Sequence, residues 1–279
     1  MKVTNTEKEL KALISSARKS KKTIGFIPTM GALHNGHLSL IEIAKKKCDY
    51  VVVSIFVNPT QFNDKKDFEK YPRNIEADIK MLEKAKVDVV FTPSEKEIYP
   101  KPDKRKFHFG KLDQILEGKH RPSHFNGVGQ VLSILFEMVE PDLSFFGQKD
   151  YQQVLVIKEL VKQLGLKTEV VACPTIRDEE GLALSSRNQL LSEEEYDEAT
   201  FIPLWMNEVK KLSLRYKVSQ IKARIETLVS QHTNMKLEYF EICDAANLNP
   251  IQDFEEAKES IAVIAIYVGK IRLIDNLML

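Results

Sequence analysis

The stretch TIGFIPTMGALHNGHLSLIEIA, residues 23–44, decides the fold expected of this chain. It opens with a short apolar run, Thr23–Ile27, that is typical of a strand and stops at a proline. A loop with two glycines follows, and apolar side chains then recur at helical spacing over residues 37–47. A strand that passes through such a loop into a helix is the repeating unit of a parallel α/β sheet.

The same alternation continues along the next part of the chain. Continuous β-branched and apolar runs, as expected of strands buried on both faces, predict strands at 51–57, 87–91, 143–146 and 168–172. Amphipathic patterns predict helices at 7–19, 75–86, 128–139 and 152–164. We therefore expect a Rossmann-like parallel sheet domain over residues 1–184.

The pattern changes after about residue 185. Two helices are predicted at 193–212 and 218–232, and two strands at 237–242 and 260–268. This arrangement indicates a smaller α+β domain over residues 185–279, although no Gly/Ser-rich linker marks the border.

Composition narrows the class of function. Lys plus Arg is 41 and Asp plus Glu is 40, so the net charge is +1, and no global basic field would attract nucleic acid or a membrane surface. The apolar runs are too short to span a bilayer, and the start of the chain lacks a signal-peptide pattern. Three widely spaced cysteines without a CxxC pair predict reduced thiols in a cytosolic protein rather than disulfides or structural zinc.

Residues 28–37, PTMGALHNGH, carry the first candidate chemistry. The loop follows the carboxyl end of a predicted strand, where ligands bind in parallel sheets, and its glycines allow close approach of a ligand. His34 and His37 are three residues apart, so both imidazoles can face one spot at the start of the helix, whose free N–H groups and dipole suit phosphate. A pair of capping or surface histidines, or a metal pair, would give the same spacing, but the strand–loop–helix context favours phosphate binding.

Four further segments lie at comparable positions. In FGQKDYQQ, residues 146–153, a lysine could neutralise phosphate and an aspartate could accept from ribose, although an N-cap and a solvated charge explain it equally well. GLALSSRN, residues 181–188, could clamp a triphosphate or be an ordinary polar loop. FVNPTQF at 56–62, with YPR at 71–73, and RPSHFNGV at 121–128 offer polar side chains for a substrate or plain turn chemistry.

Taken in order and at these spacings, the five segments closely resemble those of the pantothenate synthetase family. GKIRLIDN, residues 269–276, also resembles the usual ending of that family, and the likeness covers nearly the whole chain. HNGH and SSR are similar to the HIGH and KMSKS elements of the wider nucleotidyltransferase superfamily. The family usually has an acidic residue where this chain has Gln148, so no role is based on that side chain.

The resemblance implies an ATP-dependent ligase that joins pantoate to β-alanine through pantoyl-adenylate, with Mg²⁺, and that forms a homodimer. It implies that His34, His37 and Lys149 are catalytic, that Gln61 and Gln153 bind pantoate, and that Gln61 also contacts β-alanine. The ATP-binding residues implied are Met30, Gly31, Ala32, Leu33, His34, Asn35, Gly36, His37, Gly147, Gln148, Lys149, Asp150, Ile176, Leu184, Ser185, Ser186 and Arg187.

Several alternatives stay open from sequence. Asp78 is a weak candidate for a magnesium ligand, and the polar stretch 63–70 is either a gate or a surface loop. A related nucleotidyltransferase would share the HNGH loop but would have no use for two substrate-binding glutamines. A non-catalytic nucleotide- or RNA-binding module is a third possibility, against which the near-zero charge and the lack of a basic, aromatic stripe argue.

Overall fold

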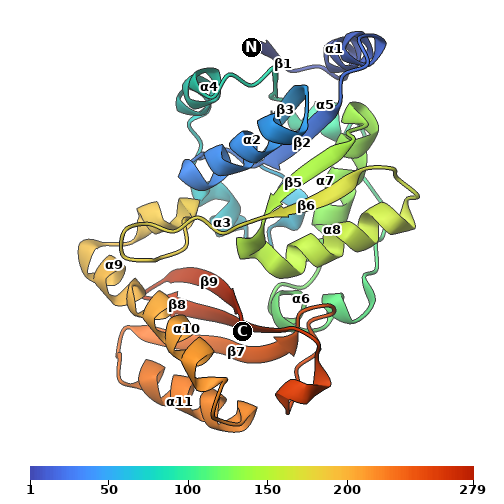
Figure 1. Cartoon of the computed structure of the whole chain (residues 1–279). Helices are drawn as coiled ribbons and strands as arrows, with labels where there is room; N and C mark the ends of the chain where they lie inside the picture. Colours follow the sequence, from blue (N-terminus) through green and yellow to red (C-terminus); the bar gives the residue numbers. More distant parts are fainter. The chain divides into compact units, whose positions relative to one another are not determined.

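A computed structural model describes residues 1–279, and the chain divides into two units (Figure 1). The first unit is Met1–Gln148 together with Gln152–Pro174, and the second is Lys149–Tyr151 together with Thr175–Leu279. The second unit therefore begins upstream of the border expected at residue 184 and includes three residues from the middle of the first unit. The division into domains over residues 1–184 and 185–279 stays a prediction.

Six parallel strands form the sheet of the first unit, namely the five that the sequence predicted and β1, which it did not predict. They are β1 (Lys2–Thr4), β2 (Ile24–Thr29), β3 (Tyr50–Ile55), β4 (Val89–Phe91), β5 (Leu143–Gly147) and β6 (Glu169–Cys173). Their order is β1-β4-β3-β2-β5-β6. The chain therefore builds outward from β2 in one direction, then returns to place β5 on the other side of β2, and this reversal is the topological switch point of the sheet.

Both faces of this sheet are apolar, which explains the continuous hydrophobic runs in the sequence. Phe26 packs on one face and Ile27 on the other, and in the same way Phe146 and Phe145 point to opposite faces. The alternation follows from the two-residue period of a strand. Each face is therefore covered by helices.

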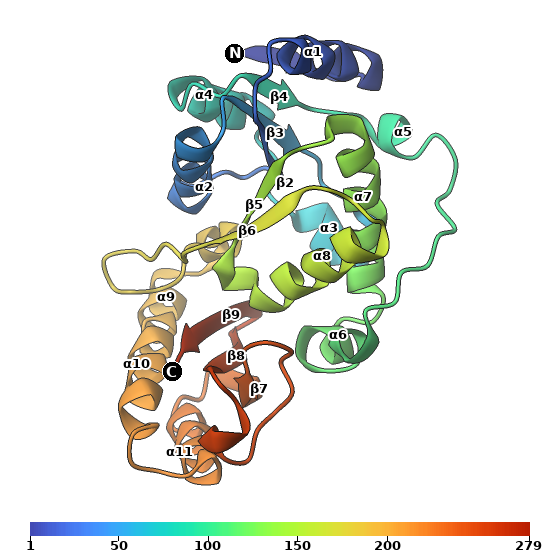
Figure 2. The same ribbon diagram turned by 45° about the vertical axis from the view of Figure 1, so that its right-hand side comes forward.

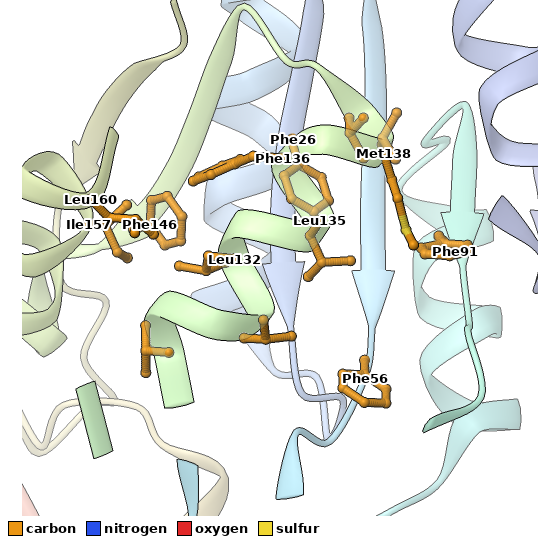
Figure 3. Packing of buried hydrophobic residues seen from close by; sticks show 14 of the residues in the cluster. Phe26, Phe56, Phe91, Leu132, Leu135, Phe136, Met138, Phe146, Ile157 and Leu160 are labelled. Atoms are coloured by element: carbon orange, nitrogen blue, oxygen red, sulfur yellow. The ribbon is translucent and has the colours of Figure 1, made fainter. Parts of the chain in front are cut away.

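Helices α1 (Glu7–Lys19), α5 (Glu95–Ile98), α7 (His124–Val139) and α8 (Tyr151–Gln163) supply the core on one face. Helices α2 (Asn35–Lys47) and α4 (Ile75–Lys84) supply it on the other. Figure 3 shows how Leu132, Leu135 and Phe136 of α7 lie against the strands, with Phe136 near Phe26. The rings of Phe26 and Phe136 meet edge to face, with centroids 6.3 Å apart.

An irregular connection links α5 to α6 (Leu116–His120) and runs along the outside of α7 and α8 (Figure 2). Side chains of those helices hold its backbone. Gln130 of α7 donates to the carbonyl oxygens of Asp103 and Arg105, and Gln163 of α8 donates to that of His108. The connection is ordered by these amides although it has little regular structure.

The second unit contains an antiparallel sheet in the order β7-β8-β9, formed by β7 (Met235–Asp244), β8 (Ser260–Val268) and β9 (Ile271–Met278). Helices α9 (Glu193–Ala199), α10 (Phe201–Leu212) and α11 (Val218–Ser230) share its apolar core. The single helix predicted over 193–212 is wrong, because α9 ends at Ala199 and α10 begins at Phe201. Pro203 has no N–H to donate, and it fits in the first turn of α10, where none is needed.

Replacing Phe136 by alanine tests the α7 face of the first core. Phe136 is 1% exposed, so Phe136→Ala should lower the free energy of unfolding by about 3–5 kcal/mol, through lost burial and a cavity. Denaturant titration followed by circular dichroism measures this change. Leu214→Ala is the control, because Leu214 is 83% exposed and its loss should change stability by less than about 0.5 kcal/mol. Equal effects of the two variants would contradict the packing described.

Candidate active site

The carboxyl ends of β2 and β5 lie side by side at the switch point of the first sheet. In open α/β sheets this is where ligands bind. The loop between β2 and α2 leaves one of these ends, and Gly147 closes the other. The sheet order thus brings together two of the segments that the sequence predicted to act on ATP.

Backbone geometry in the β2–α2 loop is unusual at two successive residues. Gly31 has φ +80° and Ala32 has φ +50°, a left-handed conformation that costs energy for a residue with a side chain. The Thr29 hydroxyl accepts from the Gly31 N–H at 3.2 Å and donates to the Ser54 carbonyl at 2.8 Å. The hydroxyl thereby ties the start of the loop to β3.

Asp78 of α4 holds the next two residues of the loop. Its carboxylate accepts from the Ala32 N–H at 3.0 Å and from the Leu33 N–H at 2.8 Å, and it is 4% exposed. A Cβ on Gly31 would stand 2.8 Å from one of these oxygens, so a glycine is needed there. We assign Asp78 a positioning role in place of the magnesium-ligand role considered from sequence.

His34 and His37 cap the start of α2 through their own ring nitrogens. The Gly36 N–H donates to His34 Nδ1 at 3.1 Å, and the His34 N–H donates to His37 Nδ1 at 3.3 Å. Because a backbone N–H can only donate, both Nδ1 atoms are acceptors, and each neutral ring carries its proton on Nε2. The ring centroids lie 4.2 Å apart, so two Nε2–H donors stand close together.

The expectation that α2 offers free N–H groups to phosphate is wrong for most of its first turn. Gly36 N–H goes to the His34 ring, and the N–H groups of His37 and Leu38 both go to the His34 carbonyl. Capping and phosphate binding were alternative interpretations from the sequence, but the two histidines can do both. Their Nδ1 atoms accept backbone N–H groups at the start of the helix, while each Nε2 carries an N–H donor.

Gln61 is buried in the short 3₁₀ turn Pro59–Gln61 that follows β3. Asn58 donates from Nδ2 to Gln61 Oε1 at 3.1 Å, which leaves Gln61 Nε2 directed at Met30 Sδ, 3.0 Å away. His124 at the start of α7 contacts the Gln61 carbonyl at 2.8 Å, and a carbonyl only accepts, so His124 carries its proton on Nδ1. Gln61 is thus fixed through both its side chain and its backbone.

Close packing of α7 on this turn depends on Gly127. A Cβ at Gly127 would meet the Thr60 carbonyl oxygen at 2.4 Å. Its own carbonyl accepts from Asn58 Nδ2 at 3.0 Å. The motif RPSHFNGV, for which sequence could not separate substrate contact from turn chemistry, therefore supports the turn that carries Gln61.

Two adjacent glutamines on α8 have different surroundings. Gln152 is buried and fully bonded, since its Nε2 donates to the carbonyls of Leu112 and Ile115 and its Oε1 accepts from the Glu117 N–H. Gln153 is half-buried on the next position of the helix. Gln152 is a structural residue that sequence analysis overlooked, and its signal was a polar residue on the helix face that also carries Val156 and Leu160.

The stretch 63–70 contains a helix, α3 (Lys65–Lys70), capped by Asp64. Phe62 packs against Phe68 and Tyr71 with ring centroids 5.3 and 5.7 Å apart, and the Arg73 guanidinium lies over Phe68. The segment is therefore an aromatic-packed helix rather than an open loop. Its role as a gate stays a prediction.

Lys149 and Asp150 belong to the second unit, where their side chains lie 3.6 Å apart. Asn276 of β9 donates to the Lys149 carbonyl at 2.7 Å, and the Tyr151 hydroxyl donates to the Ala245 carbonyl at 2.9 Å. These two bonds fasten the three-residue segment to the second unit. Burial raises the pKa of the Tyr151 phenol, so it stays a donor at neutral pH.

The segment from Ile176 to Arg187 also lies in the second unit. The Leu184 N–H donates to the Ile176 carbonyl at 2.9 Å, and the Ser185 hydroxyl accepts from the Arg187 N–H at 3.3 Å. Ser186 is buried. These bonds shape the loop that carries the SSR residues.

Arg177 and Asp275 form the main ion pair of that region. Two parallel bonds of 2.6 and 2.9 Å join them, and the Asp275 side chain is only 2% exposed. The carboxylate raises the pKa of the guanidinium. Sequence analysis quoted Asp275 within the C-terminal motif but gave it no role, because an ion pair across 98 residues has no local signal.

Asp78→Asn tests the clamp on the β2–α2 loop. The amide keeps one acceptor oxygen but turns an NH₂ group toward a backbone N–H, so the variant should lose about 1–3 kcal/mol of stability. Amide hydrogen exchange at Ala32 and Leu33 should also accelerate. Glu76→Gln, an exposed residue on the same helix, is the control and should change neither. Unchanged exchange at both amides in Asp78→Asn would contradict the clamp.

Known proteins match this chain over nearly its whole length. The family model for pantoate-beta-alanine ligase matches residues 2–278. Pantothenate synthetase of Porphyromonas gingivalis is 47% identical over 277 residues, covering 99% of each chain, and that of Phocaeicola vulgatus is 46% identical over 278 residues, again covering 99% of each.

Solved structures agree with this result. Pantothenate synthetase from Thermus thermophilus has a TM-score of 0.93 at 37% identity and covers 99% of each chain. Pantoate-beta-alanine ligase from Francisella tularensis, complexed with beta-gamma ATP and beta-alanine, has a TM-score of 0.81 at 38% identity, over 100% of this chain and 97% of that one. The chain belongs to the pantoate–β-alanine ligase family, also called pantothenate synthetase.

Proposed function

We propose that this protein condenses pantoate with β-alanine to pantothenate, with cleavage of ATP to AMP and pyrophosphate and with pantoyl-adenylate as the intermediate. The full-length family match supports the reaction, as does the crystal structure of the Francisella relative complexed with beta-gamma ATP and beta-alanine. The structural observation that carries the proposal is the pair of Nε2–H donors on His34 and His37 at the carboxyl end of β2.

In the first step a carboxylate oxygen of pantoate attacks the α-phosphorus of ATP, and the bond to pyrophosphate breaks. The nucleophile has no proton to lose, so catalysis depends on stabilising charge on the phosphate oxygens. His34 and His37 donate N–H groups that are held in place by their caps, and Lys149 contributes a positive charge. In the second step the β-alanine amine attacks the acyl carbon, AMP leaves, and the amine loses a proton as the amide forms.

Pantoate is assigned to Gln61 and Gln153, and β-alanine to Gln61. Gln61 Oε1 accepts a hydrogen bond from Asn58, so the group of Gln61 that we assign to the substrate is its NH₂ donor. A donor at this position suits the carboxylate or a hydroxyl oxygen of a hydroxy acid. The second glutamine distinguishes this reaction from that of a nucleotidyltransferase, which leaves the nucleotide on its product.

ATP is assigned to Met30–His37, Gly147–Asp150, Ile176 and Leu184–Arg187. Asp150 would accept hydrogen bonds from the ribose hydroxyls, and the SSR loop would bind the phosphates. The Ile176 carbonyl is bonded to the Leu184 N–H, so Ile176 would donate its own N–H to adenine. The N–H groups of Ala32 and Leu33 are taken by Asp78, which gives those two residues a shaping role.

Magnesium is proposed as part of the substrate, bound to the ATP phosphates. The chain has no group of three or more His, Cys, Asp or Glu residues that could hold a metal, and both oxygens of Asp78 accept backbone N–H groups. We therefore assign no residue of this chain as a ligand of a resident magnesium ion. Mg²⁺ commonly reaches such enzymes with its nucleotide and keeps most of its water ligands.

The cellular compartment and the oligomeric state of the enzyme are proposed by analogy with its family. No helix has the length and apolar character needed to cross a bilayer. All three cysteines are free, and burial raises the pKa of Cys48 and Cys173 to about 11 and of Cys243 to about 12, so these thiols are unreactive. We place the enzyme in the cytosol as a homodimer, by analogy with its family.

Product analysis tests the reaction. Incubation with ATP, Mg²⁺, pantoate and β-alanine should yield pantothenate, AMP and pyrophosphate in equal amounts. Omitting β-alanine should leave pantoate-dependent exchange between ATP and labelled pyrophosphate intact, because adenylation comes first. Formation of ADP, or a product that keeps the nucleotide, would refute the proposal.

His37→Asn separates the two functions of this ring. The asparagine oxygen stands where Nδ1 stands and can still accept from the His34 N–H, whereas the Nε2–H donor is lost. ATP/pyrophosphate exchange should fall on the order of 100-fold or more, with an unchanged thermal midpoint. Lys149→Met should lower the exchange rate to a similar extent. Lys158 is an exposed residue of α8, so the control variant Lys158→Ala should retain the full exchange rate. Near-normal exchange in both test variants would remove these residues from the mechanism.

A further inference from the structure

Tyr99 ends helix α5, far in sequence from any segment assigned to substrate. Its hydroxyl donates to Asn58 Oδ1 at 2.9 Å, and its ring packs near Phe56 with centroids 6.3 Å apart. Burial raises the pKa of this phenol to about 12, so it remains a hydrogen-bond donor throughout the neutral range. The hydroxyl does not reach Gln61 itself, and any effect on the substrate passes through Asn58.

Two backbone groups show which atom of the Asn58 amide is the nitrogen and which is the oxygen. The Gly127 carbonyl can only accept, so the atom 3.0 Å from it is Nδ2. The Thr60 N–H can only donate, so the atom it approaches at 3.4 Å is Oδ1. Oδ1 is therefore the atom that accepts from the Tyr99 hydroxyl, and the phenol bond, at 2.9 Å, is shorter than the two bonds that Oδ1 accepts from Thr60.

Asn58 passes this orientation on to Gln61. The same Nδ2 that faces Gly127 donates to Gln61, so the Gln61 atom at 3.1 Å is Oε1, and Gln61 Nε2 is the outward donor. If Asn58 rotated, its oxygen would face Gln61 Oε1, and the Gln61 amide would flip to present an acceptor. An acceptor at that position would repel a carboxylate.

We propose that Tyr99 is a positioning residue for the hydroxy-acid substrate: its phenol O–H holds Asn58 in the orientation that makes Gln61 an N–H donor. This inference rests on the proposed function, because it takes Gln61 as the residue that binds pantoate. Thr60 Oγ1 also lies 3.1 Å from Asn58 Oδ1, so the loss of the phenol weakens the chain of bonds without abolishing it.

Tyr99→Phe is the test, since it keeps the ring against Phe56 and removes only the hydroxyl. The KM for pantoate should rise about five- to tenfold, while kcat and the KM for ATP stay within about twofold. Tyr50→Phe is the matched control, because Tyr50 lies in the same unit at the opposite end of β3, and it should change none of these constants. A general structural defect would change both substrates' constants together.

A double-mutant cycle with Gln61→Ala shows whether the effect passes through Gln61. Gln61→Ala alone should raise the KM for pantoate more than Tyr99→Phe does, and adding Tyr99→Phe to it should cause no further rise. Asn58→Asp is a second variant that replaces the donor to Gln61 by an acceptor, and it should raise this KM at least as much as Tyr99→Phe.

The results distinguish a failure of the Tyr99 positioning role from a failure of the assignment of Gln61 to pantoate. If Tyr99→Phe raises the KM for pantoate equally with and without Gln61, or raises the KM for ATP to the same extent, the positioning role is refuted and the proposed function stands. If Gln61→Ala leaves the KM for pantoate unchanged, the assignment of Gln61 in the proposed function fails, and this inference fails with it.

Discussion

The candidate site depends on one constraint, which is that backbone N–H groups buried at the end of β2 need acceptors. The chain meets this need with its own side chains, since Thr29, Asp78, His34 and His37 each accept from the loop or from the first turn of α2. The left-handed Ala32 persists because these bonds hold it. The loop therefore has a defined shape of its own, and its proposed contribution to nucleotide binding comes from side-chain donors.

The same principle applies to the turn after β3. There the Asn58 amide, which is itself bonded to the Gly127 carbonyl, holds the Gln61 side chain, and the His124 ring holds the Gln61 carbonyl. In both places bonds to backbone groups, each of which can only donate or only accept, orient a side chain that could otherwise flip. The donors proposed to face an anionic substrate are therefore oriented by the fold, in a chain whose net charge is only +1.

Sequence analysis predicted the parallel sheet because runs such as Val51–Val53 are apolar on both faces. It missed β1, a three-residue edge strand with Val3 exposed, and β9, whose Asp275 and Asn276 are buried polar residues that interrupt a strand pattern. It identified the histidine loop from spacing and context. It could not find Asp78 as the loop clamp or Tyr99 as a partner of Asn58, because those contacts span 45 and 41 residues and leave no periodic signal.

The hydrogen bond from Asn276 of β9 to the Lys149 carbonyl links two parts of the sequence that are far apart. Asn276 binds the Lys149 backbone and Asp275 binds Arg177, and even the Leu279 N–H is bonded to Ser260. Loss of the Asn276 side chain would leave the histidine loop in place but would remove one of the two bonds that hold the lysine segment. Substitutions at Asn276 should therefore be poorly tolerated, although this residue is far in sequence from the lysine.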